Sequence, residues 1–173
     1  LMIEIIDDYL PEHEHRQIHD YFMGSMDDGT LNNSCAWVYI PFTSTDWTAN
    51  GERFHFAQLI YAQHQIISPA FNLMTPIIKR ENMTAIARIK ANCVMKTSEL
   101  DVYDDEFHTD FTGTLTTGIY YINSNDGYTL FEDGTKCESV ANRFCRFPCE
   151  TKHTATTCTN TNRRLLINFN YHA

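Results

Sequence analysis

Short runs of alternating apolar and polar residues make up most of the chain from Thr84 onward, separated by Gly, Asn, Asp or Ser. Alternation with a period of two is typical of β-strands with one buried face. The predicted strands are residues 85–95, 102–110, 115–123, 128–132, 136–140, 143–147, 151–157 and 163–171. Turn sequences such as Asp133-Gly134 lie between them. Eight antiparallel strands in two facing sheets predict a mainly β, jelly-roll or cupin-like fold.

The first 83 residues have a different pattern, with a short predicted strand at 2–6 and predicted helices at 11–23 and 69–80. Ser68 and Pro69 supply an N-cap and a first-turn proline for the second helix, which Pro76 should kink or shorten. Two more strands are predicted at 35–40 and 53–56, and a loop at 27–30. We therefore expect one domain over residues 1–173, in which residues 1–83 support a β core at 84–171. The two helices should cover one sheet face.

Composition narrows the functional classes. The chain has 173 residues, 43% of them hydrophobic and 20% charged, which suits a globular domain with a real core. A net charge of −9 argues against nucleic acid as the main partner, because phosphate binding needs clustered Lys and Arg. No apolar run is long enough to span a bilayer, and the first six residues are too short for a signal peptide. We expect a cytoplasmic protein with reduced cysteines.

The chemical signal is a histidine and a carboxylate one residue apart. On an extended segment His108 and Asp110 point to the same side of the backbone. His153 begins the seventh predicted strand, which can be a neighbour of the second in an antiparallel sandwich. Two histidines and one carboxylate on one face suit non-haem Fe(II) with open positions for ligands. A lone His-x-Asp is nevertheless common, and a single histidine is often only a packed or solvated residue.

Several segments after Arg88 occur in an order that is similar to that of a known enzyme family. They are His108-Thr-Asp110, Gly118-Ile-Tyr-Tyr-Ile-Asn123, Gly127-Tyr-Thr-Leu-Phe-Glu132, Asn142-Arg-Phe-Cys-Arg-Phe147, His153 and Arg163-Arg-Leu-Leu-Ile-Asn-Phe-Asn-Tyr171. Together they resemble the 2-oxoglutarate- and Fe(II)-dependent dioxygenases of the prolyl-4-hydroxylase-like subgroup. The resemblance implies a double-stranded β-helix with His108, Asp110 and His153 as iron ligands. It also implies 2-oxoglutarate as cosubstrate, O2 as oxidant and, in some members, ascorbate as reductant.

The same resemblance implies a basic residue on the last strand that binds the distal carboxylate of 2-oxoglutarate. The planar fork of arginine suits a carboxylate, and Arg163 and Arg164 both qualify. We favour Arg164, which would place Leu166, Asn168 and Asn170 inward and Leu165, Ile167, Phe169 and Tyr171 under the helices. Tyr121 matches a family tyrosine that donates its hydroxyl to the same carboxylate. Asn92, Tyr103 and Thr156 are weaker candidates for the pocket.

The sequence is also compatible with other kinds of protein. One is a jelly roll without catalysis. Another is a zinc site built from Cys145, Cys149 and His153, with Cys137 and Cys158 nearby, although Pro148 interrupts this spacing and His108 and Asp110 would stay unexplained. A halogenase would need a small residue in place of Asp110. No cysteine lies in a recognisable nucleophile motif.

The substrate is predicted only by analogy. The prolyl-hydroxylase-like strands suggest hydroxylation of a prolyl residue in a peptide or protein, or of a small molecule such as free proline, with succinate and CO2 as coproducts. Trp37, Tyr39, Phe54 and His55 are candidate substrate-facing residues, although packing of the helices on the sheet is the better explanation for most of them. Arg88, Lys90, Arg143 and Arg146 form a candidate basic strip. The sequence predicts no oligomeric state.

Overall fold

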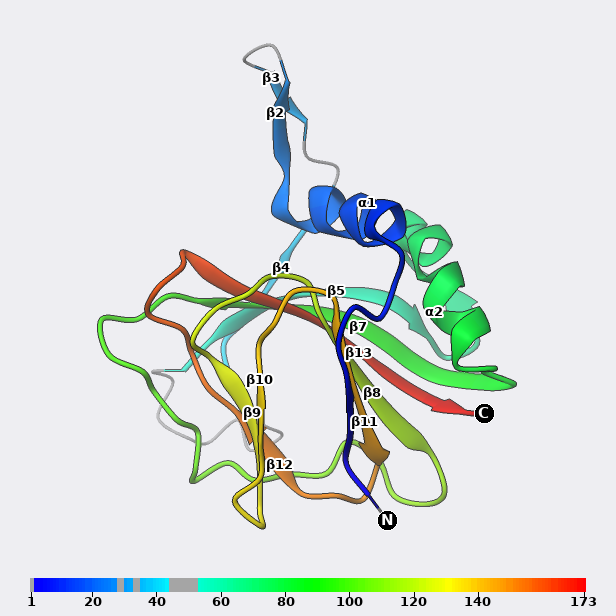
Figure 1. Cartoon of the computed structure of the whole chain (residues 1–173), viewed down its shortest axis with the longest axis vertical. Coiled ribbons are helices and arrows are strands. Elements are labelled where there is room, and N and C mark those ends of the chain that lie inside the picture. The colour runs from blue at the N-terminus through cyan, green and yellow to red at the C-terminus, as the bar shows by residue number, and fades with distance from the viewer. Residues whose placement is uncertain (1, 28–29, 33–34, 44–52) are drawn as a thin grey trace.

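A large antiparallel sheet forms one wall of the molecule (Figure 1). The structure is a computed structural model that describes residues 2–27, 30–32, 35–43 and 53–173. In spatial order the sheet comprises β1 (Glu4–Ile6), β11 (Arg143–Pro148), β8 (Thr116–Tyr121), β13 (Arg163–His172), β7 (Ala85–Met95), β5 (His55–Ala62) and β4 (Val38–Ile40), with β6 (Gln65–Ile66) paired to β5. The predicted strands at 85–95 and 163–171 are confirmed and lie side by side at its centre.

A smaller sheet faces the large one and closes the sandwich. It comprises β10 (Lys136–Glu138), β9 (Tyr128–Phe131) and β12 (His153–Ala155). A separate hairpin of β2 (Ser25–Asp27) and β3 (Thr30–Asn32) projects beyond the helices (Figure 1). The predicted loop at 27–30 falls partly on residues 28–29, which lie outside the described residues. The prediction of a mainly β fold with two facing sheets is confirmed.

The segment 102–110 is not the strand that its alternation predicts. It makes only two isolated bridges, Val102 with Thr156 and His108 with His153. The reason lies in its composition, because Asp104, Asp105 and Glu106 are residue types that strands disfavour, and a turn forms at 104–105. The second predicted strand is therefore an irregular connection that still reaches β12 at His153.

The helices pack on the outer face of the large sheet (Figure 1). Helix α1 (Glu12–Met23) buries Ile18 and Phe22 against it, as predicted. The predicted helix at 69–80 is instead a 3-10 helix η1 (Pro69–Met74) followed by the short α2 (Thr75–Arg80). Ser68 caps η1, since its Oγ accepts the Ala70 N–H at 3.2 Å. Pro76 lies in the first turn of α2, where the missing N–H costs nothing.

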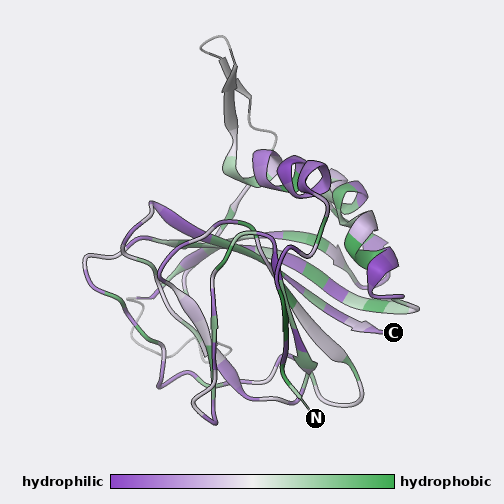
Figure 2. Ribbon diagram, in the orientation of Figure 1, coloured by the Kyte–Doolittle hydropathy of each residue, from purple (hydrophilic) through white to green (hydrophobic). Residues whose placement is uncertain are grey.

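The two central strands divide the interior into two sides. Banding of hydrophobic and polar residues is visible along both of them (Figure 2). One face carries Ile89, Ala91 and Cys93 of β7 and Leu165, Ile167 and Phe169 of β13, all packed in the main core beneath the helices. Burying each large apolar side chain contributes about 1.5–3 kcal/mol. The opposite face, which carries Arg164, is turned toward the smaller sheet and can therefore hold a site.

Candidate metal centre and pocket

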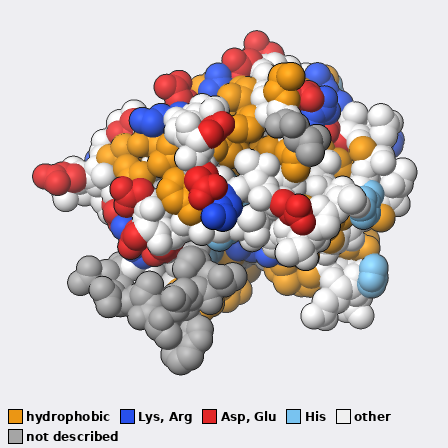
Figure 3. Space-filling view, turned by 90° about the horizontal axis from the view of Figure 1, so that it is seen from below, with side chains coloured by type: hydrophobic (Ala, Val, Ile, Leu, Met, Phe, Trp, Pro, Cys, Tyr) orange, Lys and Arg blue, Asp and Glu red, His pale blue; other side chains and the backbone are white. Residues whose placement is uncertain are grey.

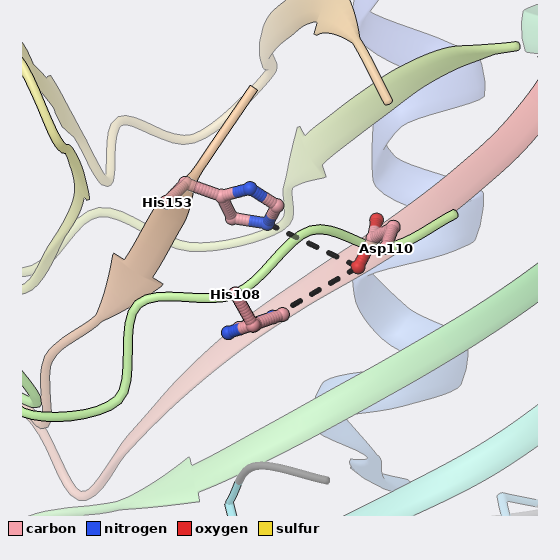
Figure 4. A group of neighbouring side chains, drawn as sticks. All are labelled: His108, Asp110 and His153. Atoms are coloured by element: carbon pink, nitrogen blue, oxygen red, sulfur yellow. Dashed lines mark ion pairs between the residues drawn. The ribbon is translucent and has the colours of Figure 1, made fainter. Parts of the chain in front are cut away.

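Three metal-ligating side chains converge between the two sheets. The ligand atoms of His108, Asp110 and His153 lie within 4.8 Å of one another, and each histidine Nε2 is 3.9 Å from Asp110 Oδ1. Figure 4 shows both rings and the carboxylate pointing toward one another, with His153 on β12 and the other two on the irregular connection. The backbones of His108 and His153 exchange two hydrogen bonds of 3.0 Å. These bonds fix the relative position of the two backbone segments that carry the imidazoles.

Both histidines are held in the tautomer that a metal requires. His108 Nδ1 lies 3.1 Å from the carbonyl oxygen of Glu106, and His153 Nδ1 lies 2.9 Å from that of Thr151. A carbonyl only accepts, so each Nδ1 must donate, and each Nε2 is left with a lone pair. Such backbone partners orient metal-binding imidazoles and raise their basicity.

The carboxylate of Asp110 is oriented by side chains of β13 and β8 in the large sheet. Its Oδ2 accepts the Asn170 Nδ2–H at 2.9 Å and the Thr117 hydroxyl at 3.3 Å. Asn170 and Thr117 face each other across β13 and β8, and Arg88 Nε in turn donates to Asn170 Oδ1 at 3.2 Å. Oδ2 is thereby occupied, and Oδ1 is directed at the two imidazoles.

The charges at the triad favour binding of a cation. Burial would raise the pKa of Asp110, but His153, Asn170, Arg88 and His108 together hold it below its ordinary value. Burial lowers the pKa of His153, against the opposing effect of Asp110, and so favours the neutral ring. An ionised carboxylate beside neutral imidazoles is the protonation state that a metal ion needs.

A cavity of about 110 Å³ extends from the triad between the sheets. Strand β7 lines it with Arg88, Lys90, Asn92 and Val94, and β13 lines it with Arg164, Leu166 and Asn168. The inward set predicted with Arg164 therefore faces this cavity, apart from Asn170, which touches Asp110 instead. Arg163 points away and donates to the carbonyl of Met23.

Arg164 is a buried cation without a carboxylate. It is 1% exposed, donates from Nε to Ser139 Oγ at 2.8 Å and from Nη2 to Thr129 Oγ1 at 3.3 Å, and lies 5.7 Å from the Tyr121 ring centroid. No described residue offers it an acidic partner within ion-pair distance. Burial lowers its pKa, which shows that the surroundings disfavour the charge. A guanidinium so placed at a cavity wall is suited to bind an anion.

Tyr121 is buried beside Arg164 but does not line the cavity. Its hydroxyl pairs with Thr129 Oγ1 at 2.7 Å, so the Thr129 hydroxyl stands between it and the space. The predicted direct role of Tyr121 stays a prediction. Asn92 and Tyr103 line the cavity, whereas Thr156 Oγ1 accepts the Tyr128 N–H and does not. Sequence reasoning missed Thr129 and Ser139, since nothing in their local pattern marks a buried hydroxyl.

The segment that carries His108 is held by a charged cluster that the sequence did not suggest. Arg53 donates to both carboxylate oxygens of Asp101 at 3.0 Å, to Glu106 at 3.1 Å and to Asp105. Its guanidinium also lies 4.6 Å from the Tyr103 ring centroid. These four contacts hold in place a segment that lacks the regular hydrogen bonds of a β-strand. Because Glu106 also accepts from His108 through its carbonyl, the cluster helps to position a triad residue.

The four candidate basic-strip residues do not form one strip. Arg88 and Lys90 line the cavity, whereas Arg143 pairs with Asp7 and Arg146 pairs with Glu4 and Glu81. On the face in Figure 3, Lys and Arg side chains lie among Asp and Glu side chains. Among the described residues, no helix is both long and apolar enough to cross a membrane.

The candidate aromatic residues also separate into two groups. His55 lines the cavity, with Nδ1 2.9 Å from the Phe42 carbonyl oxygen. Trp37 packs on Phe22, and the rings of Tyr39 and Phe54 are in tilted contact, with centroids 5.6 Å apart. The packing interpretation therefore fits Trp37, whereas Tyr39 and Phe54 remain 53% and 38% exposed.

The cysteine site is not assembled. Within the described part of the chain, His108, Asp110 and His153 are the one group of three or more His, Cys, Asp or Glu residues close enough to share a metal ion. Cys145 and Cys137 are buried in one hydrophobic cluster and do not belong to this group. Cys149 Sγ lies 3.4 Å from the carbonyl oxygen of Gly113. The zinc interpretation therefore has no support in the geometry.

No protein-family model and no curated protein matches the sequence. The structure, however, is similar to solved structures. An oxidoreductase of the 2OG-Fe(II) oxygenase family from Burkholderia pseudomallei aligns at a TM-score of 0.64 and 12% identity, over 98% of this chain and 84% of that one. A non-haem α-ketoglutarate-dependent epimerase of nogalamycin biosynthesis aligns at 0.63 and 10%, over 98% and 75%. The fold is a double-stranded β-helix.

A third similar structure is a prolyl hydroxylase from Trichoplax adhaerens, in complex with a hypoxia-inducible-factor peptide fragment. It aligns at a TM-score of 0.56 and 12% identity, over 98% of this chain and 82% of that chain. Identities this low establish the architecture and leave the chemistry to be argued from the residues themselves. The fold predicted from the family resemblance is confirmed.

Proposed function

We propose that the protein is an Fe(II)- and 2-oxoglutarate-dependent dioxygenase that hydroxylates a C–H bond. The observation that carries the proposal is one cavity with a His-Asp-His triad and an arginine that lacks a carboxylate partner among the described residues. A dicarboxylate with a keto group next to one carboxyl is suited to both ends: one end can chelate a metal, and the other can pair with a guanidinium.

The residues present fit the groups that the proposal requires. Two imidazole nitrogens and one carboxylate oxygen on one side suit Fe(II), and sulfur ligands, which would favour zinc, are not part of the triad. The hydroxyls of Ser139 and Thr129 fix the guanidinium of Arg164. We infer that Arg164 binds the distal carboxylate of 2-oxoglutarate, with Tyr121 acting on it through Thr129.

The mechanism divides between cofactor and protein. When bound, Fe(II), 2-oxoglutarate and O2 supply oxidative decarboxylation to succinate and CO2 and insertion of one oxygen atom into a C–H bond. The protein's part is binding, orientation and exclusion of side reactions. His108, Asp110 and His153 would hold the metal, and Asn170 with Thr117 would keep the carboxylate ionised and in place. Leu166, Val94 and Ile119 give the cavity an apolar wall that limits water.

For the substrate, a prolyl residue in a peptide is supported by the similarity to the peptide-bound prolyl hydroxylase. The similar epimerase structure belongs to a protein with another reaction, so similarity of fold does not by itself select hydroxylation. Asp110 favours hydroxylation over halogenation because it occupies the position that a halogenase leaves open for halide.

The test compares Asp110→Ala with Asp133→Ala, whose carboxylate lies in an exposed turn and accepts the Thr135 N–H. Protein is loaded anaerobically with Fe(II) and 2-oxoglutarate, exposed to O2, and screened against proline-containing peptides and free amino acids for succinate and for a mass gain of one oxygen. We expect turnover in wild type and Asp133→Ala and none in Asp110→Ala. Metal affinity, measured by Zn(II) titration, should fall only in Asp110→Ala. Full turnover in Asp110→Ala would remove this residue from the iron site.

A further inference from the structure

Two polar side chains lie next to each other on the cavity wall between the triad and Arg164. Lys90 of β7 and Asn168 of β13 are directly paired across the two strands, and both line the cavity. The neighbouring positions on the same face are Asn170 with Arg88 toward Asp110, and Leu166 with Asn92 toward Arg164. The pair therefore lies midway along the cavity wall formed by β7 and β13, beside the space where a substrate would approach the metal.

Neither side chain is satisfied within the protein. Asn168 Oδ1 is buried and has no hydrogen-bond partner. Lys90 is half-buried at the cavity, and no ion pair or hydrogen bond joins its Nζ to any described residue. Leaving a buried polar atom or charge unpaired is costly, and proteins rarely do so without a ligand. Burial also lowers the pKa of Lys90 to about 8, with Arg88 adding to this effect and Asp110 opposing it.

The other charged groups of the cavity already have partners. Arg88 lies 3.6 Å from Asp110 Oδ1 and donates to Asn170, and Glu106 is engaged by Arg53 and Thr43. Among described residues, Arg164 and Lys90 are thus the cavity cations without a carboxylate. In the proposed function, one carboxylate of 2-oxoglutarate goes to Arg164 and the other to the metal. Lys90 still lacks a counter-ion once the cosubstrate is bound.

We propose that Lys90 and Asn168 recognise the primary substrate, and that this substrate carries a carboxylate close to an N–H group. Lys90 pairs with the carboxylate, and the N–H donates to Asn168 Oδ1. Two kinds of molecule offer this chemistry: a free amino acid, and an acidic residue with its backbone amide in a peptide. The inference rests on the proposed function for the location of the cosubstrate.

The experiment measures binding and needs no turnover. Zn(II)-loaded protein saturated with 2-oxoglutarate is titrated with two pairs of probes, observed by NMR. One pair is L-proline and L-prolinamide, and the other is N-acetyl-L-aspartate N-methylamide and its asparagine counterpart. We expect the acid of one pair to bind about tenfold more tightly than its amide, because one charge-assisted hydrogen bond separates them. The pair that shows the preference identifies the source of the carboxylate.

Variants assign the preference to Lys90. Lys90→Met should abolish it and Lys90→Arg should retain it, while Lys96→Met, an exposed lysine just past the end of β7, should leave it unchanged. Asn168→Ala should weaken both members of a pair equally. Replacing an unpaired cation by Met is not expected to prevent folding, and Lys90→Arg gives an independent readout.

Several outcomes would overturn the inference. Equal binding of acid and amide in both pairs would do so. So would a Lys90→Met protein that keeps the preference but binds 2-oxoglutarate about tenfold more weakly, since Lys90 would then serve the cosubstrate. A protein that prefers the acids and yet never consumes 2-oxoglutarate with iron and O2 would count against the proposed function, not against the Lys90–Asn168 pair.

Discussion

Replacing Arg164 by Met should weaken the binding of 2-oxoglutarate without lowering the stability of the ligand-free protein. Arg164 is 1% exposed and its described partners are two neutral hydroxyls. If it binds the distal carboxylate of 2-oxoglutarate, its loss removes charge-assisted hydrogen bonds worth about 1.5–3 kcal/mol each. A loss of about 3 kcal/mol corresponds to a roughly 100-fold weaker affinity for 2-oxoglutarate.

The ligand-free protein should respond differently. The substitution removes two hydrogen bonds from a charged donor, worth about 1.5 kcal/mol each, but it also removes a buried unpaired charge whose desolvation costs several kcal/mol. We therefore expect Arg164→Met to unfold at the same or a higher temperature, by about 2–4 °C for each kcal/mol gained in a domain of this size.

The assay is thermal unfolding with and without saturating 2-oxoglutarate and Zn(II), together with the KM for 2-oxoglutarate. Added 2-oxoglutarate should raise the Tm of the wild type and fail to do so in Arg164→Met. Arg163→Met is the matched control, because Arg163 lies on the opposite face and contacts the Met23 carbonyl. A lower Tm in ligand-free Arg164→Met with an unchanged KM would show that Arg164 is a structural cation and that our reasoning is wrong.

Three further predictions address the surroundings of the site. Asn170→Ala should weaken Zn(II) binding about 10–100-fold by freeing Asp110 Oδ2, whereas Asn72→Ala, on an exposed turn of η1, should not; equal affinities would contradict the role of Asn170. Arg53→Met should speed amide hydrogen exchange over residues 101–108 and weaken Zn(II) binding, and unaltered exchange would show that this segment is held by other contacts. Burial, with Lys90, lowers the pKa of His55 to about 4, so the folded state binds fewer protons than the unfolded state and loses stability as the pH falls from about 6.5 toward 4. Up to about 3 kcal/mol is lost by this route, and urea titrations of His55→Gln should show a flatter pH dependence than those of the exposed-residue control His172→Gln.

The sequence predicted those parts of the fold that depend on local alternation. Residues 85–95 and 163–171 are strands because their apolar residues face one continuous core, and the same alternation placed Arg164 with Leu166 and Asn168. Alternation predicted a strand at 102–110, although the acidic residues at 104–106 disfavour one, and it could not predict the path of this connection, which Arg53 holds from 48 or more positions earlier in the chain. Nor could it predict the shielding of Tyr121, since Thr129 reaches it only through the facing sheet.

The site also draws on contacts that no local pattern contains. His108 and His153 are brought together by reciprocal backbone hydrogen bonds across 45 positions, and the sequence indicated only that such a pairing was geometrically sensible. In the sequence, Lys90 was one of four residues of a candidate basic strip. Its burial in the cavity follows from the register of β7 against β13, which is a property of the assembled sheet.

The irregular connection between β7 and the triad has a consequence for how this protein can change over evolutionary time. A one-residue insertion in β7 or β13 would turn the side chains that follow it in that strand to the opposite face. At the start of β13, such an insertion would turn Arg164 away from the cavity and put an apolar neighbour in its place. An insertion between Lys96 and Tyr103 shifts no ladder, because that stretch makes only isolated bridges. In homologues of this chain, length differences should therefore gather before His108 and be absent from the two central strands. The connection that carries His108 can therefore lengthen, whereas β7 and β13 cannot.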